Sequence, residues 1–475
     1  MTSSITSRLP SWRLLMLPLI GGLAVQGAQA VPSYARQTGM PCEACHTMYP
    51  ELTPFGRDFK MNGYTITGMQ QIQSKGSDNA AALKINEIPP LSLMLQTSVS
   101  EVRGVNKANG PAAQQVSSQF PQQLSLFFAG EISPHMGSFL QITYNHQSDH
   151  FTQDQSEIRY ANQSTLAGMP LTYGLTLNNT PTMEDPWQDT PAWGFPYITP
   201  GAALPTPAAQ PFIMGKLAQS VVGIGGYMHL DNHWYADLTG YRSEQAGLNQ
   251  PYQPNATNML SGVAPYLRLA YDTNVGNGYL EVGAYGMAIN QIPAGITGAS
   301  NRMVDSAVDT QYELPLGNDE LIVRGTYIHE NDTWNAIPQV AAGVQCAAGT
   351  VCSSNNSDSL NTLNLNASFH FANQQEVSLG ILRTTGTSDY AYYNNNQVVA
   401  GVPYGNPNVL SGDASGSPDS TAWIAQYEFL PWQNVQLGVQ YTAYTKFNGA
   451  TTNYDGMGRN ASANNTAMVY GWFMW

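Results

Sequence analysis

Residues 363–371 read LNLNASFHF, in which every odd-numbered position is apolar or aromatic and every even-numbered position is polar. Successive side chains of a β-strand point to opposite faces, so this alternation predicts a strand with one apolar and one polar face. Residues 280–285 and 435–442 repeat the pattern. The sequence therefore indicates a chain built largely from strands that each have one apolar face.

Sixteen segments of this kind follow one another from about residue 89 to the end of the chain. Each has roughly ten residues or slightly more, which is enough for a tilted strand to cross a bilayer. We expect the strands at 90–103, 121–133, 137–147, 156–165, 170–179, 218–230, 233–243, 264–274, 278–290, 302–314, 319–331, 359–371, 374–387, 420–430, 434–447 and 464–475.

The connections between these strands alternate strictly between short and long. This alternation is typical of a transmembrane β-barrel, whose short turns face the periplasm and whose long loops face outward. An even number of strands then places both chain ends on the periplasmic side. We expect tight links near 134–136, 166–169, 231–232, 275–277, 315–318, 372–373 and 431–433, and long connections at 104–120, 148–155, 180–217, 244–263, 291–301, 332–358, 388–419 and 448–463.

The composition agrees with a porin-like, all-β barrel of about 16 strands over residues 89–475. Charged residues make up only 11% of the chain, against about a quarter in typical soluble domains, whereas there are 26 Tyr and 44 Gly. The last predicted strand ends at the aromatic residue Trp475, a usual feature of barrels assembled into the bacterial outer membrane. The net charge of −14 does not suggest nucleic acid as a partner.

The first 30 residues have the parts of a secretory signal peptide. Arg8 and Arg13 are basic, residues 14–25 are apolar, and residues 28–30 read AQA, a small-residue cleavage site. The apolar run is too short for a good membrane-spanning helix. We therefore expect the mature chain to begin at Val31 and to leave the cytoplasm.

Residues 42–46 read CEACH, the C-x-x-C-H pattern to which a c-type haem is attached. The Cys42 and Cys45 thiols would add to the two vinyl groups of one haem, and His46 would be the axial ligand of its iron. A zinc site would need a second, similarly spaced cysteine pair, and a thioredoxin-type dithiol would need a βαβ context. The sequence shows neither, so it predicts one covalently attached c-type haem.

Residues 31–75 are expected to form a small α-helical cytochrome segment, joined to the barrel by a linker at 76–88. Pro41 suits the first turn of a short helix that carries the haem motif, and Thr53 with Pro54 predicts a second helix that continues to Asn62. About 45 residues are too few to bury an ordinary core. We therefore favour a segment that plugs the barrel lumen over one that is freely tethered.

Several side chains of this segment have more than one interpretation. Phe55 and Phe59 share a helix face and could pack on the porphyrin. Arg57 and Lys60 could pair with the haem propionates or could be solvated surface charges. The second axial ligand is left open: Met69 and Met61 are the nearest downstream candidates, Met40 and Met48 lie too close to the motif, and His370 could reach from the barrel wall.

Polar positions of the predicted strands place charged residues in the lumen. Either they line a water-filled pore as pairs, or they contact the plugging segment. Two other groups are less specific: Cys346 and Cys352 predict a disulfide in a long loop, with a metal site as the weaker alternative, and acidic loop residues could guide cations. The lumen-facing residues are Arg159, Asp237, Arg268, Glu281, Arg324, His370 and Glu428, and the acidic loop residues are Asp149, Asp154, Glu184, Asp185 and Asp189.

The haem segment resembles a known family. Residues 32–46 read PSYARQTGMPCEACH, and the pattern continues through Pro50, Leu52, Gly56-Arg57, Phe59-Lys60 and Gly63-Tyr64. In these positions the chain is similar to the fused cytochrome c–porin iron oxidases in the outer membrane of iron-oxidising bacteria. The barrel matches that family only in architecture, length and chain end.

The resemblance implies that Fe(II) is oxidised outside the cell and that the electron passes through the haem to a periplasmic carrier. That carrier would be a soluble cytochrome c or a blue-copper protein. It also implies Cys42, Cys45 and His46 as the haem-binding residues. Two other functions remain open: an electron conduit for another donor or for electron export, and a diffusion porin with a tethered haem.

Overall fold

The computed structural model describes residues 31–66, 69, 71–74, 83–104, 115–145, 150–201, 207, 209–243, 259–293, 298–341, 351–393, 398–399, 402–403, 413–456 and 458–475. The predicted signal peptide, residues 1–30, lies outside these ranges. So do Cys346 and Asp149.

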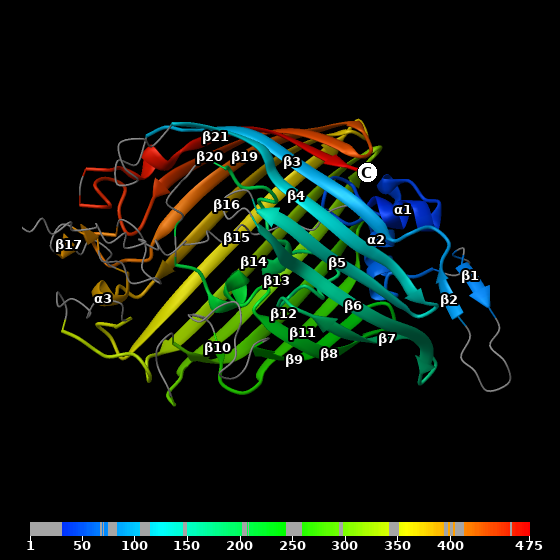
Figure 1. Cartoon of the computed structure of the whole chain (residues 1–475), viewed down its shortest axis with the longest axis horizontal. Coiled ribbons are helices and arrows are strands. Elements are labelled where there is room, and N and C mark those ends of the chain that lie inside the picture. The colour runs from blue at the N-terminus through cyan, green and yellow to red at the C-terminus, as the bar shows by residue number, and fades with distance from the viewer. Residues whose placement is uncertain are drawn as a thin grey trace, which may run out of the picture.

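Sixteen long antiparallel strands form one closed barrel (Figure 1). Each strand pairs with its neighbours in chain order, and the last pairs with the first, with Val469 opposite Val99. The strands are β3 (Leu91–Val102), β4 (Val116–Ser133), β5 (Met136–Asn145), β6 (His150–Leu166), β7 (Met169–Asn178), β8 (Val221–Leu230), β9 (Trp234–Ser243), β11 (Ala264–Val275), β12 (Gly278–Ile292), β13 (Asn301–Leu316), β14 (Asp319–Thr333), β15 (Ser357–Phe371), β16 (Gln375–Gly386), β19 (Ser420–Trp432), β20 (Val435–Lys446) and β21 (Thr466–Met474).

The prediction of sixteen strands and a porin-like barrel is confirmed, but two strands begin well before their expected starts: β4 begins at Val116, five residues before 121, and the error at β6 is larger. Strand β6 begins at His150, six residues before its expected start at 156, and His150 pairs with Asn145 of β5. The connection between β5 and β6 is therefore much shorter than the expected loop at 148–155. The run from Thr152 to Gln155 is polar throughout and has no alternation, so it gave no strand signal, although Thr152 and Gln153 pair with Thr143 and Ile142 of β5 before the register is interrupted by a bulge.

The two faces of the barrel wall have opposite polarity. On β15 the odd-numbered Leu365 and Phe369 are exposed on the outside, whereas Asn366 and Ser368 are buried toward the lumen. The same alternation recurs along the other strands, with exposed apolar residues such as Ile224, Leu238 and Val469 on the outer surface. An apolar outside and a polar inside are expected of a barrel surrounded by lipid.

The N-terminal unit, residues 31–66, lies at the barrel end where the short turns are (Figure 1). It contains α1 (Pro32–Thr38), the 3-10 turn η1 (Cys42–Ala44) and α2 (Pro54–Met61). Thr53 caps α2 by accepting a hydrogen bond from the Gly56 amide through its hydroxyl, as its position before Pro54 predicts. None of the helices in the described ranges has the length and apolar composition of a membrane span.

Helix α1 is absent from the sequence prediction, although two residues signal it. Pro32 stands in its first turn, and Gly39 ends it with a left-handed φ of 70°. The expected linker at 76–88 also contains structure, because β2 (Leu83–Asn86) pairs with β1 (Gln71–Ser74) in a small hairpin beyond the barrel end. The remaining short elements are η3 (Pro191–Trp193), η4 (Phe212–Lys216), β10 (Met259–Leu260), α3 (Tyr390–Tyr393), β17 (Val398–Val399), β18 (Val402–Pro403) and η5 (Ala461–Asn464).

The inward loop, residues 179–201, differs most from expectation. It was expected to be part of an outward-facing connection, but it folds into the barrel, and Glu184, Asp185 and Trp187 are almost fully buried. The Asp185 carboxylate organises the loop because its Oδ2 accepts hydrogen bonds from the Asp189 and Thr190 amides and from the Thr190 hydroxyl. The lumen is therefore filled from one end by the N-terminal unit and further in by this loop.

Candidate haem site

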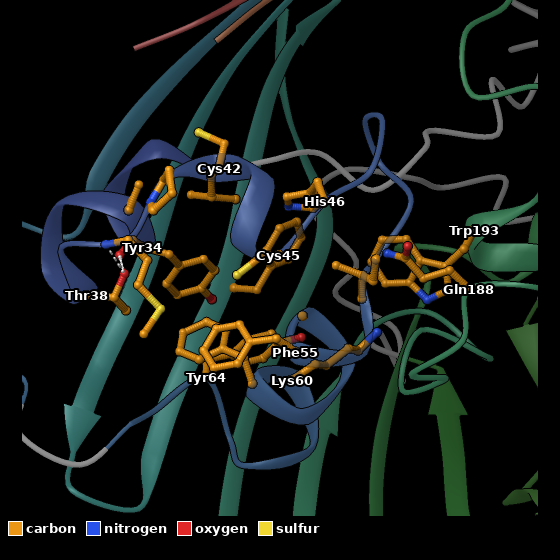
Figure 2. Close-up of a pocket in the computed structure, with 18 residues that line it drawn as sticks. Tyr34, Thr38, Cys42, Cys45, His46, Phe55, Lys60, Tyr64, Gln188 and Trp193 are labelled. Carbon is orange, nitrogen blue, oxygen red and sulfur yellow. Dashed lines mark hydrogen bonds between the residues drawn. The ribbon is translucent and has the colours of Figure 1, made fainter. Parts of the chain in front are cut away.

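A cavity lies between η1, α2 and the inward loop, and all three residues of the haem motif line it (Figure 2). Its empty space is about 760 Å³, counting the mouth that opens to solvent. The lining residues are Val31, Tyr34, Ala35, Thr38, Met40, Pro41, Cys42, Cys45, His46, Leu52, Phe55, Gly56, Phe59, Lys60, Tyr64, Phe139, Gln188 and Trp193.

The turn η1 sets the relative positions of the motif residues. The amides of Cys45 and His46 both donate to the Cys42 carbonyl, at 3.1 and 3.0 Å, so the backbone from Cys42 to His46 is closed into a compact turn. Cys42 and Cys45 are free thiols and are only partly buried. Two thiols and an imidazole on the wall of one cavity are the donor set that covalent haem attachment requires.

The His46 ring is prepared to act as a ligand. Its Nδ1 lies 3.2 Å from the Pro50 carbonyl oxygen, so Nδ1 carries the proton and donates it, which leaves Nε2 for a metal. Burial disfavours the charged imidazolium and lowers the pKa of His46 to about 4. The imidazole is thus neutral at ordinary pH, the form in which histidine binds a metal.

Aromatic rings form one wall of the cavity. Tyr34 packs edge-on against Phe59, with 5.1 Å between ring centroids, and stacks on Tyr64 at 5.6 Å. The two hydroxyls point away to the barrel wall, where Tyr34 donates to the Ser138 carbonyl at 2.7 Å and Tyr64 donates to the Glu157 carboxylate at 2.6 Å. The rings therefore leave a largely apolar surface that suits a flat, apolar macrocycle.

Gly56 is required where α2 meets the haem motif. A Cβ atom added at this position would lie 2.3 Å from the Cys45 carbonyl oxygen, which is backbone and cannot rotate away. Any side chain here would push α2 away from the turn that carries Cys45.

We predict that Gly56→Ala lowers the yield of covalent haem per chain several-fold, because the methyl group separates the two walls of the cavity. The measurement is the haem absorbance of purified protein per mole of chain. The control is Gly226→Ala on β8, where an added Cβ would meet nothing closer than 3.5 Å. Equal haem content in the Gly56 and Gly226 variants would show that the close approach does not matter.

Two buried ion pairs anchor the N-terminal unit to the barrel wall. Arg57 of α2 makes a two-pronged pair with Glu313 of β13, in which Nη2 lies 3.1 Å from Oε2. Glu51 pairs with Arg324 of β14 and also accepts from the Tyr197 hydroxyl at 3.0 Å. Arg57 is therefore not a solvated charge: it is 3% exposed, its guanidinium is bound by Glu313, and it does not line the cavity. Its partner could not be foreseen because Glu313 is 256 residues away in the chain.

Further contacts attach the motif itself to the barrel. The Cys42 amide donates to the Gln433 side chain at 3.0 Å, and the Tyr49 hydroxyl donates to the Gln433 carbonyl, in the turn between β19 and β20. Elsewhere on the wall, Arg159 of β6 donates to the Lys60 carbonyl at 3.3 Å. The N-terminal unit thus touches strands around the barrel. Of the two interpretations of the lumen-facing charges, Arg159 and Arg324 follow contact with a plugging segment, whereas Arg268 pairs with carboxylates of the barrel wall and the inward loop.

Lys60 differs from Arg57 because it does line the cavity. Its ammonium donates to the carbonyls of Met183 and Asp185, at 2.6 and 2.8 Å, and lies 4.2 Å from the centre of the Trp193 ring. Burial lowers the pKa of Lys60 to about 7, although the nearby Glu157 carboxylate opposes the shift. Lys60 therefore joins the N-terminal unit to the inward loop instead of pointing into solvent.

The expected second axial ligands are not brought to the cavity. Met61 is on the side of α2 away from it and packs with Trp187, Tyr227 and Tyr235. The reason is helix geometry: Phe55, Gly56, Phe59 and Lys60 share the cavity face, and Met61 is one residue past it. Met69 and His370 are described but do not line the cavity either, whereas Met40, judged too close to the motif, does.

Three cavity residues come from outside the N-terminal unit and were not predicted from the sequence: Phe139 of β5, and Gln188 and Trp193 of the inward loop. A signal existed in the loop, since Trp187, Trp193, Phe195 and Tyr197 are too many large aromatic residues for a solvated connection. Elsewhere, Cys352 is buried and disulfide-bonded, while its predicted partner Cys346 lies outside the described residues.

Comparison with known proteins yields structural likeness only. The sequence matches no family model and no curated protein sequence. Among solved structures, the match to OmpF of Salmonella typhi in complex with daunomycin covers 81% of this chain and 97% of the OmpF chain, at 12% identity and a TM-score of 0.45. The outer membrane channel DcaP of Acinetobacter baumannii covers 81% and 96%, at 10% identity and a TM-score of 0.44. OprB of Pseudomonas putida covers 81% and 94%, at 10% identity and a TM-score of 0.43.

Proposed function

We propose that this chain is an outer-membrane cytochrome–porin that takes electrons from extracellular Fe(II) and passes them to a periplasmic electron carrier. The observation that carries the proposal is the placement of Cys42, Cys45 and His46 on one cavity within the mouth of a closed barrel. A haem held there would place a one-electron centre within a protein channel through an otherwise insulating membrane.

The surface of the barrel supports a location in the outer membrane. Apolar residues cover its outside and polar residues its inside, as lipid requires. We place the short turns and the N-terminal unit on the periplasmic side and the long connections outside the cell. The predicted signal peptide and the haem motif agree, because c-type haem is attached outside the cytoplasmic membrane.

The residues present fit a c-type haem. Cys42 and Cys45 would hold it through thioethers and His46 would bind its iron, while Tyr34, Phe59, Tyr64 and Trp193 would exclude water from its faces. When bound, the haem supplies a one-electron centre. The hydrogen bond from His46 Nδ1 to Pro50 strengthens the histidine as a ligand and orients its ring.

Fe(II) as the electron donor is supported by the resemblance of residues 32–64 to the iron-oxidising cytochrome–porins and by the filled lumen. The N-terminal unit and the inward loop occupy the space that a diffusion porin would leave to solutes. Moving only the electron inward leaves poorly soluble Fe(III) outside. The acceptor we propose is a soluble cytochrome c or a blue-copper protein.

Anaerobic mixing of Fe(II) with the purified, oxidised holoprotein tests this function. We expect the haem absorbance to change to that of the reduced form at the growth pH of the source organism, one electron per haem. Zn(II) at the same concentration is the control for metal binding without electron transfer. A haem that stays oxidised in excess Fe(II) would refute iron oxidation and leave a conduit for another donor.

A further inference from the structure

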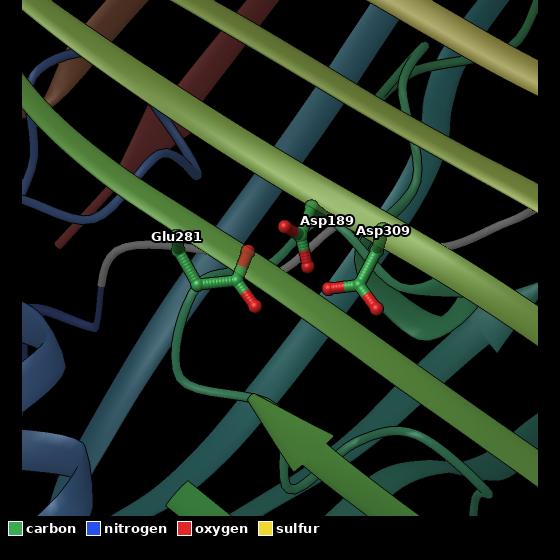
Figure 3. A group of neighbouring side chains, drawn as sticks. All are labelled: Asp189, Glu281 and Asp309. Atoms are coloured by element: carbon green, nitrogen blue, oxygen red, sulfur yellow. The ribbon is translucent and has the colours of Figure 1, made fainter. Parts of the chain in front are cut away.

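Three buried carboxyl groups converge in the lumen from three separate segments (Figure 3). Asp189 belongs to the inward loop, Glu281 to β12 and Asp309 to β13. One oxygen from each lies within 4.8 Å of the others, and the three residues are 5%, 0% and 3% exposed. Their burial distinguishes them from a solvated acidic surface.

The negative charge of this cluster exceeds its positive charge. Arg268 of β11 places Nη2 3.4 Å from Asp189, 3.1 Å from Glu281 and 2.7 Å from Asp309. The same Nη2 lies 3.2 Å from a fourth carboxylate, Asp185. One guanidinium thus faces four carboxylates, and burying such an excess of like charge is costly unless a cation or protons compensate it.

The cluster also has unused ligand atoms. When all three carboxyl groups are ionised, Asp189 Oδ2, Glu281 Oε2 and Asp309 Oδ1 are buried and accept no hydrogen bond from any described residue. The Arg268 Nε and Nη1 atoms are likewise buried without a described partner, so the guanidinium does not reach these oxygens. Buried polar atoms are nearly always paired, so three orphaned carboxylate oxygens in one group point to a partner that is not protein.

From these observations we propose that Asp189, Glu281 and Asp309 bind a divalent metal cation inside the barrel. Three carboxylates form an all-oxygen ligand set, which suits hard divalent ions such as Mn²⁺, Mg²⁺, Ca²⁺ and Fe²⁺. A dication would also reduce the excess of three negative charges left by Arg268 to one.

The position of this site relates it to the cavity of the haem motif. Gln188 lines that cavity, and the next residue along the inward loop is the ligand Asp189. Trp187, before Gln188, lies with its ring centre 5.6 Å from the Arg268 guanidinium carbon. A cation held here would lie on the lumen side of the cavity wall. The identification of this cation as Fe(II) awaiting oxidation rests on the proposed function. The proposal of a cation site does not depend on that function.

The site is tested by titrating the purified holoprotein with Mn²⁺ and measuring the concentration of the free ion by electron paramagnetic resonance. We expect one Mn²⁺ per chain in the wild type and at least a tenfold loss of affinity in Glu281→Gln and, separately, in Asp309→Asn. The matched control is Glu376→Gln, which removes another buried lumen carboxylate with an orphaned oxygen. Haem content and the shift of folded barrel on unheated gels show that each variant has folded.

Unchanged Mn²⁺ affinity in both Glu281→Gln and Asp309→Asn, or the absence of stoichiometric Mn²⁺ binding by the wild type, would overturn the site. Either result would mean that protons compensate the cluster. The link to iron has its own test in the same variants: Glu281→Gln should slow haem reduction by Fe(II) at least tenfold. If Mn²⁺ binds as expected but Fe(II) fails to reduce the wild-type haem, the proposed function is refuted and the cation site stands.

Discussion

Replacing Cys42 and Cys45 together by alanine is expected to abolish covalent haem attachment, from one haem per chain to none. Each thioether needs its own thiol, and both free thiols in the described residues belong to this motif. Single replacements should retain at most one bond and a reduced haem yield. Haem that remains with the chain on a denaturing gel, detected by its peroxidase activity, is the measurement.

The control for this experiment is Glu43→Ala. Glu43 stands between the two cysteines on η1 but is exposed, so its loss should leave covalent haem unchanged. The barrel of the double variant should still fold, since its strands pair without the N-terminal unit. Covalent haem in the double cysteine variant would contradict the assignment of this motif.

The second large effect is expected from Glu313→Gln, which leaves Arg57 buried without its partner. Breaking a buried ion pair from one side costs about 3–5 kcal/mol, and this pair holds α2 against β13. The N-terminal unit should then detach from the lumen wall at lower temperature. We expect a several-fold increase in single-channel conductance in planar bilayers and a lower temperature for loss of the native haem spectrum.

Two variants separate this effect from a general loss of stability. Arg57→Met combined with Glu313→Leu replaces the pair by apolar side chains and should recover much of the wild-type behaviour, because no buried charge is left alone. Lys446→Met breaks the ion pair with Asp419, in which the Lys446 side chain is 39% exposed and the Asp419 side chain 23% exposed. This variant should change the conductance little. Equal conductance in Glu313→Gln and the wild type would show that this ion pair does not hold the lumen closed.

The barrel was predictable because lipid imposes a local rule. Each strand must present apolar residues outward, so Leu365 and Phe369 alternate with Asn366 and Ser368 without regard to distant contacts. The rule gives no signal at the start of β6. There His150 to Gln153 pair with β5, although the run from Thr152 onward is polar and does not alternate, so only the partner strand reveals this part of β6.

The contents of the lumen were much less predictable. The motif C-x-x-C-H lies in five adjacent residues, so the prediction that Cys42, Cys45 and His46 hold a haem could be made from the sequence directly. In contrast, the partner of Arg57 is Glu313, and the cavity wall includes Trp193 of a loop expected outside. Such pairs depend on how a distant segment folds into the barrel, and one sequence contains no periodic signal for that.

The most direct test of the account is electron transfer across a membrane. The holoprotein would be inserted into vesicles with its long connections outward and an oxidised soluble cytochrome c inside, and Fe(II) would be added outside without oxygen. We expect the enclosed cytochrome c to be reduced by the wild type and not by the Cys42→Ala, Cys45→Ala double variant. Reduction at equal rates in both would contradict the claim that this haem site carries the electron.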